Sequence, residues 1–153
     1  IAVGVDQPDL VADFPVVRTL MERALQIDED YADGAIHEVF ITLDGMSPSM
    51  GGDAARARTH FERAVELSKG KSASAYVAMA ASVAQPANNK EEFQKLLEQA
   101  LAVRQQAAGD LQRYTALLER GAATRAEFDA VQSRARVAEA AARAGVDAQS
   151  LHA

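Results

Sequence analysis

The stretch Phe61-Glu62-Arg63-Ala64-Val65-Glu66-Leu67 decides the fold, because the chain contains its pattern three times. The earlier copy is Met21-Glu22-Arg23-Ala24-Leu25-Gln26-Ile27, and the later one is Leu97-Glu98-Gln99-Ala100-Leu101-Ala102-Val103. Each copy places a large apolar residue, an alanine three positions later and an aliphatic residue three positions after that on one face of a helix. The copies begin 40 and then 36 residues apart, which is the spacing of helical-hairpin repeats. They predict an array of packed helices, in which the alanine lets a neighbouring helix approach closely.

The composition agrees with an all-α protein and excludes several functions. Of the 153 residues, 48% are hydrophobic but only 5% are aromatic, which favours packed helices over sheet. No apolar run reaches the roughly 18 residues that a membrane-spanning helix needs. The chain has no cysteine, so disulfides, thiol catalysis and cysteine-ligated zinc are excluded. Its net charge of −6 argues against a nucleic-acid partner, because binding depends on neutralising phosphates.

Turn and capping signals divide residues 1–103 into five expected helices. Asp53 is placed to act as an N-cap, and Asn89 with Glu92 is placed to form a capping box. The expected helices span residues 15–27, 31–43, 54–67 and 75–83, and a fifth starts near residue 90. The side chains expected to be buried between them are Met21, Ala24, Ala35, Ile36, Val39, Phe40, Leu43, Phe61, Ala64, Leu67 and Leu97.

The fifth helix is expected to continue well beyond the repeats. Its pattern has no glycine or proline from Lys90 to Ala108, and Gly109 costs only about 1 kcal/mol in a helix interior. We therefore expect one helix from Lys90 to Glu119, roughly 45 Å long. The alternative is a break at Gly109, which would let a separate hairpin pack against the body.

A second arm is expected to fold back along this helix. Gly121 suits a left-handed cap, and Thr124 with Glu127 forms a second capping box for a helix that extends to Arg143. The resulting divisions are a tetratricopeptide-like helical-repeat body (1–103), an antiparallel helical hairpin (104–144) and a frayed tail from Gly145 (145–153).

An ordered series of short motifs carries a family resemblance. Its members are Asp-Gln-Pro-Asp-Leu-Val-Ala-Asp (6–13), Met-Glu-Arg-Ala-Leu (21–25), Gly34-Ala35-Ile36-His37, Ala57-Arg58, His60-Phe61-Glu62-Arg63-Ala64, and Phe93 with Leu96-Leu97. Their order and spacing resemble the T component of tripartite ATP-independent periplasmic (TRAP) transporters over roughly residues 1–103. The resemblance implies an α-helical protein of degenerate tetratricopeptide repeats, often lipid-anchored in the periplasm, that forms a homotrimer with the solute-binding P component.

The function implied by this resemblance is that of a non-catalytic periplasmic scaffold. It would assist TRAP-type solute uptake by binding the periplasmic solute-binding protein or a small ligand, in a groove lined by His37, Phe40 and Tyr76. The membrane would be reached only through an N-terminal anchor that is missing from this sequence. No nucleic acid is expected as a partner.

After Arg104 the sequence is similar to another family. Residues 105–144 resemble the α-hairpin of periplasmic membrane-fusion proteins, the adaptors of efflux pumps. In that family three hairpin-tip positions contact an outer-membrane channel, and Arg113, Leu117 and Thr124 fall on them. The alternative function is therefore an adaptor-type hairpin that docks onto a channel or efflux component. A chain that joins pieces of both families is a third possibility.

The sequence predicts no catalytic, cofactor or metal site. No pair among its three histidines has ligand spacing; His37 is expected to be a packed or hydrogen-bonded helix residue and His60 to lie at the surface. The acidic cluster in residues 28–34 lacks the ligand positions of an EF-hand, and Gly51-Gly52 has no following Lys-Ser/Thr to make a phosphate loop. Nucleophile, base and orienting acid do not recur at a recognisable spacing, so the chain is not expected to be an enzyme.

Overall fold

The computed structural model describes residues 14–150, and all regular structure in that range is helical. The α-helices are α2 (Phe14–Ile27), α3 (Ala35–Asp44), α4 (Ala54–Leu67), α5 (Ala73–Met79), α6 (Lys90–Glu119) and α7 (Arg125–Ser150). Short 3-10 helices lie at Tyr31–Asp33 and Pro48–Met50, and a π-helical turn at Ala80–Ala84 extends α5. The expected all-α class is confirmed for the described residues.

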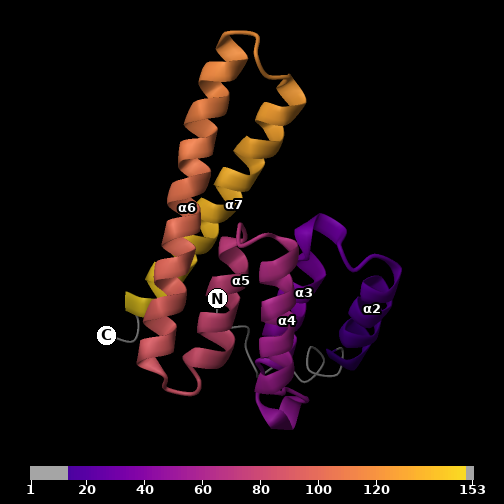
Figure 1. Ribbon diagram of the computed structural model, residues 1–153. Coiled ribbons are helices and arrows are strands. Elements are labelled where there is room, and N and C mark those ends of the chain that lie inside the picture. The colour runs from indigo at the N-terminus through magenta and orange to yellow at the C-terminus, as the bar shows by residue number, and fades with distance from the viewer. Residues whose placement is uncertain (1–13, 151–153) are drawn as a thin grey trace.

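The helices form a body and a projecting arm (Figure 1). Helices α2 to α5 and the first half of α6 make up the body, and the three repeated stretches lie on α2, α4 and α6. Helix α6 continues without a break past Gly109 to Glu119, as predicted. Helix α7 runs back antiparallel to it, so that the far parts of α6 and α7 stand clear of the body.

Predicted caps form at the starts of α4, α6 and α7. Asp53 Oδ1 accepts hydrogen bonds from the backbone N–H of Ala55 (2.8 Å) and of Arg56 (3.3 Å), and Asn89 Oδ1 accepts one from Glu92 N–H. The Thr124–Glu127 capping box is reciprocal, since Glu127 N–H donates to Thr124 Oγ1 and Thr124 N–H to Glu127 Oε2. These side chains satisfy N–H groups that a helix start leaves free.

The main core lies between α3, α4, α5 and α6, and small residues supply much of it. Its buried members are Ile41, Ala57, Ala64, Ala75, Met79, Ala80, Val83, Ala84, Leu96 and Leu97. Two of the repeat alanines, Ala64 and Ala100, are 0% and 1% exposed, which confirms the expected close approach of helices at these positions.

Burial of the repeat anchors is less complete than the sequence predicts. Leu97 is buried, but Met21, Ala24, Phe61 and Leu67 are only partly covered. Helix α2 has no fully buried residue because it lies at the edge of the body and packs chiefly on α3. Phe61 packs edge-on against Tyr76 without full enclosure. We therefore expect Phe61→Ala to cost less than the roughly 3–5 kcal/mol typical of an enclosed phenylalanine.

The helix predicted over 31–43 is wrong in its first turn. Ala32, Asp33 and Gly34 all have positive φ angles, and α3 begins only at Ala35. Gly34 (φ 93°) lies so close to α4 that an added Cβ would be 3.1 Å from Leu67 Cβ. The left-handed turn brings the chain onto α4. One register expectation also fails, because Val39 is 40% exposed, whereas Ile36, Phe40 and Leu43 are buried as predicted.

The C-terminal part of α7 belongs to the body. The chain was expected to fray from Gly145, but α7 continues to Ser150, and Gly145 is buried. A Cβ there would be 2.7 Å from Leu97 Cδ2 and 3.2 Å from Val77 Cγ2. The alanine seam of α7 is confirmed at Ala138 and Ala142, each 2% exposed. Helix α7 therefore fastens the arm to α5 and α6.

Gly109 offers a direct test of the free-standing part of α6. It lies in the helix interior, is exposed, and has no neighbouring atom within 4 Å of an added Cβ. Gly109→Ala should therefore stabilise the protein by about 0.5–1 kcal/mol, because alanine loses less backbone entropy in a helix. A rise in the urea midpoint checks this. A fall would show that the glycine is needed for a bend.

Candidate functional site

The predicted groove residue His37 lies in the body beside a second histidine. His37 is on α3 and is 5% exposed, and its Nδ1 is 2.8 Å from Nδ1 of His60 on α4. The ring of Phe40 stacks on His60, with centroids 4.6 Å apart and planes 14° from parallel. The expectation that His37 is a packed or hydrogen-bonded helix residue is confirmed. The expected surface position of His60 is wrong, since its side chain is only 20% exposed.

A carboxylate lies at each end of this histidine pair. His37 Nε2 is 3.3 Å from Glu29 Oε1, and His60 Nε2 is 3.7 Å from Asp44 Oδ2. His37 Nε2 and Asp44 Oδ2 are buried, and neither makes a regular hydrogen bond to a described residue. The order Glu29–His37–His60–Asp44 is a chain of four titratable side chains from the α2–α3 turn, α3 and α4. We call these four residues the histidine chain.

Arginines neutralise both ends of the histidine chain. Asp44 is 1% exposed, and its Oδ1 accepts hydrogen bonds from Arg18 of α2 (2.8 Å) and Arg56 of α4 (3.1 Å). Arg63 donates to both carboxylate oxygens of Glu29, at 2.7 and 3.1 Å. Asp44 thus joins three successive helices, and Glu29 ties the α2–α3 turn to α4.

Burial sets the protonation of the two histidines. It lowers the pKa of His37 below the ordinary 6.5, although Glu29 acts in the opposite direction. Burial also lowers the pKa of His60, and positive charge on His37 would lower it further. Hydrogen bonding from Arg63 lowers the pKa of Glu29. The pair is therefore neutral and Glu29 is ionised near neutral pH.

The histidine chain holds helices together and does not resemble a reaction centre. Its rings are covered, and within residues 14–150 no three ligand side chains converge as a metal site would require. Sequence reasoning missed the pair because 23 positions separate its members. One usable signal was present: His37 lies on α3 between Ile36 and Phe40, both expected to be buried, and His60 directly precedes the anchor Phe61 of the neighbouring repeat helix.

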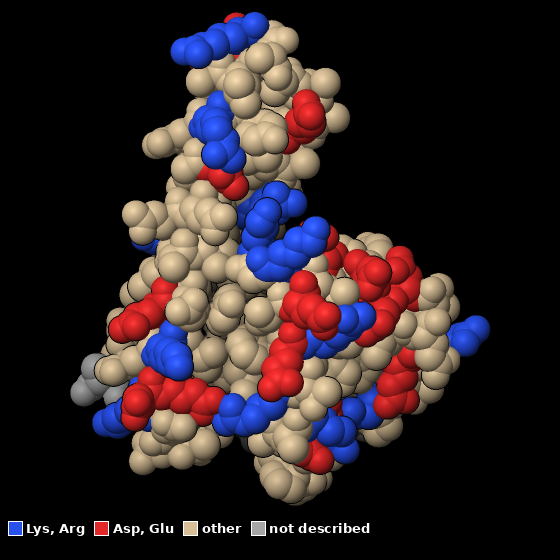
Figure 2. Space-filling model, in the orientation of Figure 1, with Lys and Arg blue, Asp and Glu red and all other residues tan. Residues whose placement is uncertain are grey.

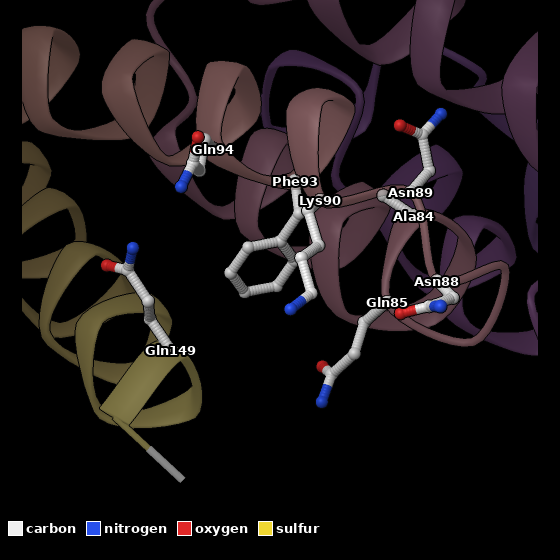
Figure 3. Close-up of a pocket in the computed structure, with 8 residues that line it drawn as sticks. All are labelled: Ala84, Gln85, Asn88, Asn89, Lys90, Phe93, Gln94 and Gln149. Carbon is white, nitrogen blue, oxygen red and sulfur yellow. The ribbon is translucent and has the colours of Figure 1, made fainter. Parts of the chain in front are cut away.

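An open pocket of about 440 Å³ lies at the base of the body. Its lining residues are Ala84, Gln85, Asn88, Asn89, Lys90, Phe93, Gln94 and Gln149. Figure 3 shows the Phe93 ring between Gln149 of α7 and the Gln85 side chain, with Lys90 beside it. The pocket adjoins the π-helical turn, and Asn88 has a left-handed backbone (φ 53°). Both features are enriched at functional sites.

The other predicted site residues lie apart from the histidine chain. The Tyr76 ring packs edge-on against Phe61, with centroids 5.5 Å apart. Near the arm tip, Arg113 pairs with Asp110 on its own helix (2.8 Å), Leu117 is partly buried, and Thr124 caps α7. The proposed groove of His37, Phe40 and Tyr76 and the proposed tip contact remain predictions.

Family membership follows from comparison with known sequences. The sequence profile described as "TRAP transporter T-component" matches residues 1–131. The chain belongs to the TRAP transporter T-component family. No curated protein and no solved structure gives a match. The T-component family is an accessory to TRAP solute uptake and is not a known enzyme family.

The extent of the T-component match corrects one expectation. The resemblance was expected to end near Arg104, but the match continues through α6 and the tip into α7, as far as residue 131. Most of the segment that resembles an adaptor hairpin thus lies within the T-component match. A junction of two families is therefore not needed to account for the arm. In the described part of this T component, no helix has the length and apolar character needed to cross a membrane.

Proposed function

We propose that this T component is a non-catalytic periplasmic scaffold that assists TRAP solute uptake by binding the solute-binding protein. The observation that carries the proposal is the family match, which spans α2 to α6 and the start of α7. The covered histidine chain, which lacks the open reacting centre of an enzyme, agrees with a scaffold. A homotrimer and a lipid anchor in the periplasm are further proposals that rest on the family resemblance alone.

We further propose that the body is a degenerate tetratricopeptide array. The three repeated stretches lie on α2, α4 and α6, and these helices alternate along the chain with α3, α5 and α7. Such arrays bind protein partners on extended surfaces between their helices. The partner would then meet both the body and the arm that continues from its last repeat helix.

The arm is the element that we propose to contact the partner. All seven cationic residues after position 103 are arginines. Figure 2 shows basic side chains spaced along the arm with some acidic ones among them, while further acidic side chains gather over part of the body. Arginine is enriched at protein interfaces because its planar group binds carboxylates through two hydrogen bonds. Arg134 and Arg136 of α7 are exposed, so an acidic patch of the partner would fit there.

Titration calorimetry with a purified TRAP solute-binding protein tests this proposal. We expect the intact chain to bind, and Arg134→Glu/Arg136→Glu to weaken binding about tenfold or more through like-charge repulsion. Arg23→Glu is the matched control, since Arg23 is an exposed arginine on α2 at the far edge of the body. No binding by a folded chain to any candidate partner would contradict the scaffold function. Equal loss in both variants would contradict the role of the arm.

A small polar ligand is the second candidate, and the pocket at the base of the body favours it. Carboxamides both donate and accept hydrogen bonds, and Gln85, Asn88, Gln94 and Gln149 all line this pocket. The Phe93 ring offers an apolar surface, and Lys90 a single positive charge. Ligand screening by thermal shift, with Phe93→Ala as the comparison, tests it. A compound that stabilises the parent and the Phe93→Ala variant equally would exclude this pocket as its binding site.

A further inference from the structure

The contact between the two histidines restricts how many protons the pair can hold. The 2.8 Å distance between Nδ1 of His37 and Nδ1 of His60 requires one hydrogen between these atoms, donated by one ring and accepted by the other. The two Nε2 atoms face carboxylates, Glu29 at 3.3 Å and Asp44 at 3.7 Å. A neutral pair carries two hydrogens in total, so one Nε2 must be bare.

His37 Nε2 and Asp44 Oδ2 both lack a regular hydrogen bond, so the two distances decide only which arrangement is favoured. The shorter distance, 3.3 Å from His37 Nε2 to Glu29, favours the N–H on that nitrogen, and the longer one, 3.7 Å from His60 Nε2 to Asp44 Oδ2, favours the bare nitrogen on His60. A third hydrogen on His60 Nε2 would give Asp44 Oδ2 a donor and leave the Nδ1 contact intact. A fourth could go only to the remaining Nδ1, and two N–H groups would then oppose each other at 2.8 Å.

We infer that the His37–His60 contact is an acid-labile latch between α3 and α4, which holds with up to one added proton on the pair and opens when both rings become imidazolium. The latch belongs to the body and is independent of partner binding, so it goes beyond the proposed scaffold function. When it opens, α3 and α4 lose the direct contact between these two rings, while the ion pairs of Asp44 with Arg56 and of Glu29 with Arg63 stay in place.

The surrounding charges largely cancel, so that burial decides in favour of the uncharged pair. Asp44 is neutralised by Arg18 from α2 and Arg56 from α4, and Glu29 by Arg63 from α4. Asp30 of the α2–α3 turn adds one negative charge near His37. Glu29, Asp30 and Asp44 favour protonated histidines, but burial acts against protonation and is the larger effect at both rings.

The latch makes folding sensitive to pH in a definite window. In the unfolded chain both histidines take up a proton near pH 6.5, whereas the folded latch accepts at most one. Acidification below about pH 6.5 therefore favours the unfolded chain. Each proton that the unfolded chain binds and the folded pair does not raises the equilibrium constant for unfolding about tenfold per pH unit. The pKa values of Glu29 and Glu92 are lowered from the ordinary 4.5. Protonation of these carboxylates therefore reduces the stability of the fold only in a separate, more acidic pH range.

Heteronuclear NMR of the histidine rings in the intact chain tests the latch between about pH 8 and pH 5, a range that spans ordinary histidine titration. At high pH we expect one ring to carry hydrogen on Nδ1 and the other ring to be bare at Nδ1. On acidification we expect a coupled titration whose second step falls below the ordinary pKa of 6.5. Two rings that both carry hydrogen on Nε2 at high pH, or that titrate independently near 6.5, would overturn the latch.

Urea unfolding gives a second readout. The double variant His37→Gln/His60→Gln should lose the slope of stability between about pH 6.5 and pH 5, whereas Glu92→Gln, which removes an ion pair between α4 and α6, should keep it. A slope that survives in the double variant would contradict the latch. If that variant does not fold, the NMR titration of the unaltered chain still decides.

Discussion

Replacing Phe40 by alanine should lower the free energy of unfolding by about 3–5 kcal/mol. Phe40 is 2% exposed and packs in a cluster between α2 and α3 that includes Ile36 and Leu43. Its ring also stacks on His60 of α4. The substitution therefore removes apolar burial, leaves a cavity, and withdraws the surface that holds one ring of the histidine chain. Urea unfolding followed by circular dichroism measures the loss.

Val39→Ala is the matched control for this substitution. Val39 precedes Phe40 on the same helix but is 40% exposed, so its truncation should change stability by no more than about 0.5 kcal/mol. Equal losses in the two variants would mean that α3 is rotated relative to its described position. A Phe40→Ala protein as stable as the parent would show that this cluster does not hold α2 and α3 together.

Asp44→Ala should cost about 3 kcal/mol, the lower end of the range for breaking a buried ion pair. The Asp44 side chain is 1% exposed and accepts hydrogen bonds from Arg18 and Arg56. These arginine side chains are 26% and 52% exposed, so water can solvate both after the carboxylate is removed. That partial rehydration keeps the cost away from the upper end of the range. Thermal unfolding at neutral pH measures it.

Asp53→Ala provides the comparison for Asp44→Ala. Asp53 also lies near Arg56, at 3.8 Å, but its side chain is 44% exposed and its main role is to cap α4. Loss of an N-cap costs about 1 kcal/mol, so this variant should be clearly more stable than Asp44→Ala. The reverse order would show that Asp44 does not join α2, α3 and α4.

Features set by local sequence were predictable. The span of α4 (Ala54–Leu67) and the continuous α6 follow from apolar periodicity and from the absence of strong breakers, and the caps at Asp53, Asn89 and Thr124 follow from their spacing to the first turn. The repeat alanines Ala64 and Ala100 are buried where the pattern predicts. These properties depend on residues close in sequence, which is why a single chain suffices to predict them.

Features set by packing between helices were not predictable in the same way. Periodicity identifies an apolar face but not whether another helix covers it, which is why Met21 and Phe61 are less buried than expected. The left-handed turn before Ala35 depends on contact with Leu67, 33 residues after Gly34 in the chain. The histidine pair likewise forms only when α3 and α4 pack. The sequence predicted fraying from Gly145 because local sequence does not reveal that this residue packs against Leu97 and Val77 on other helices.

The central claim is that the body and the arm share one continuous helix within a single T component. Amide hydrogen exchange across Val103–Leu111 is its most direct test. Helix α6 spans Lys90–Glu119, and the family match includes all of it. Continuous hydrogen bonding predicts slow exchange through the whole segment, with no gap at Gly109, because exchange requires local opening of the helix. Fast exchange confined to Ala107–Asp110, between protected flanks, would contradict the account, since it would make the arm a separate hairpin joined at a hinge.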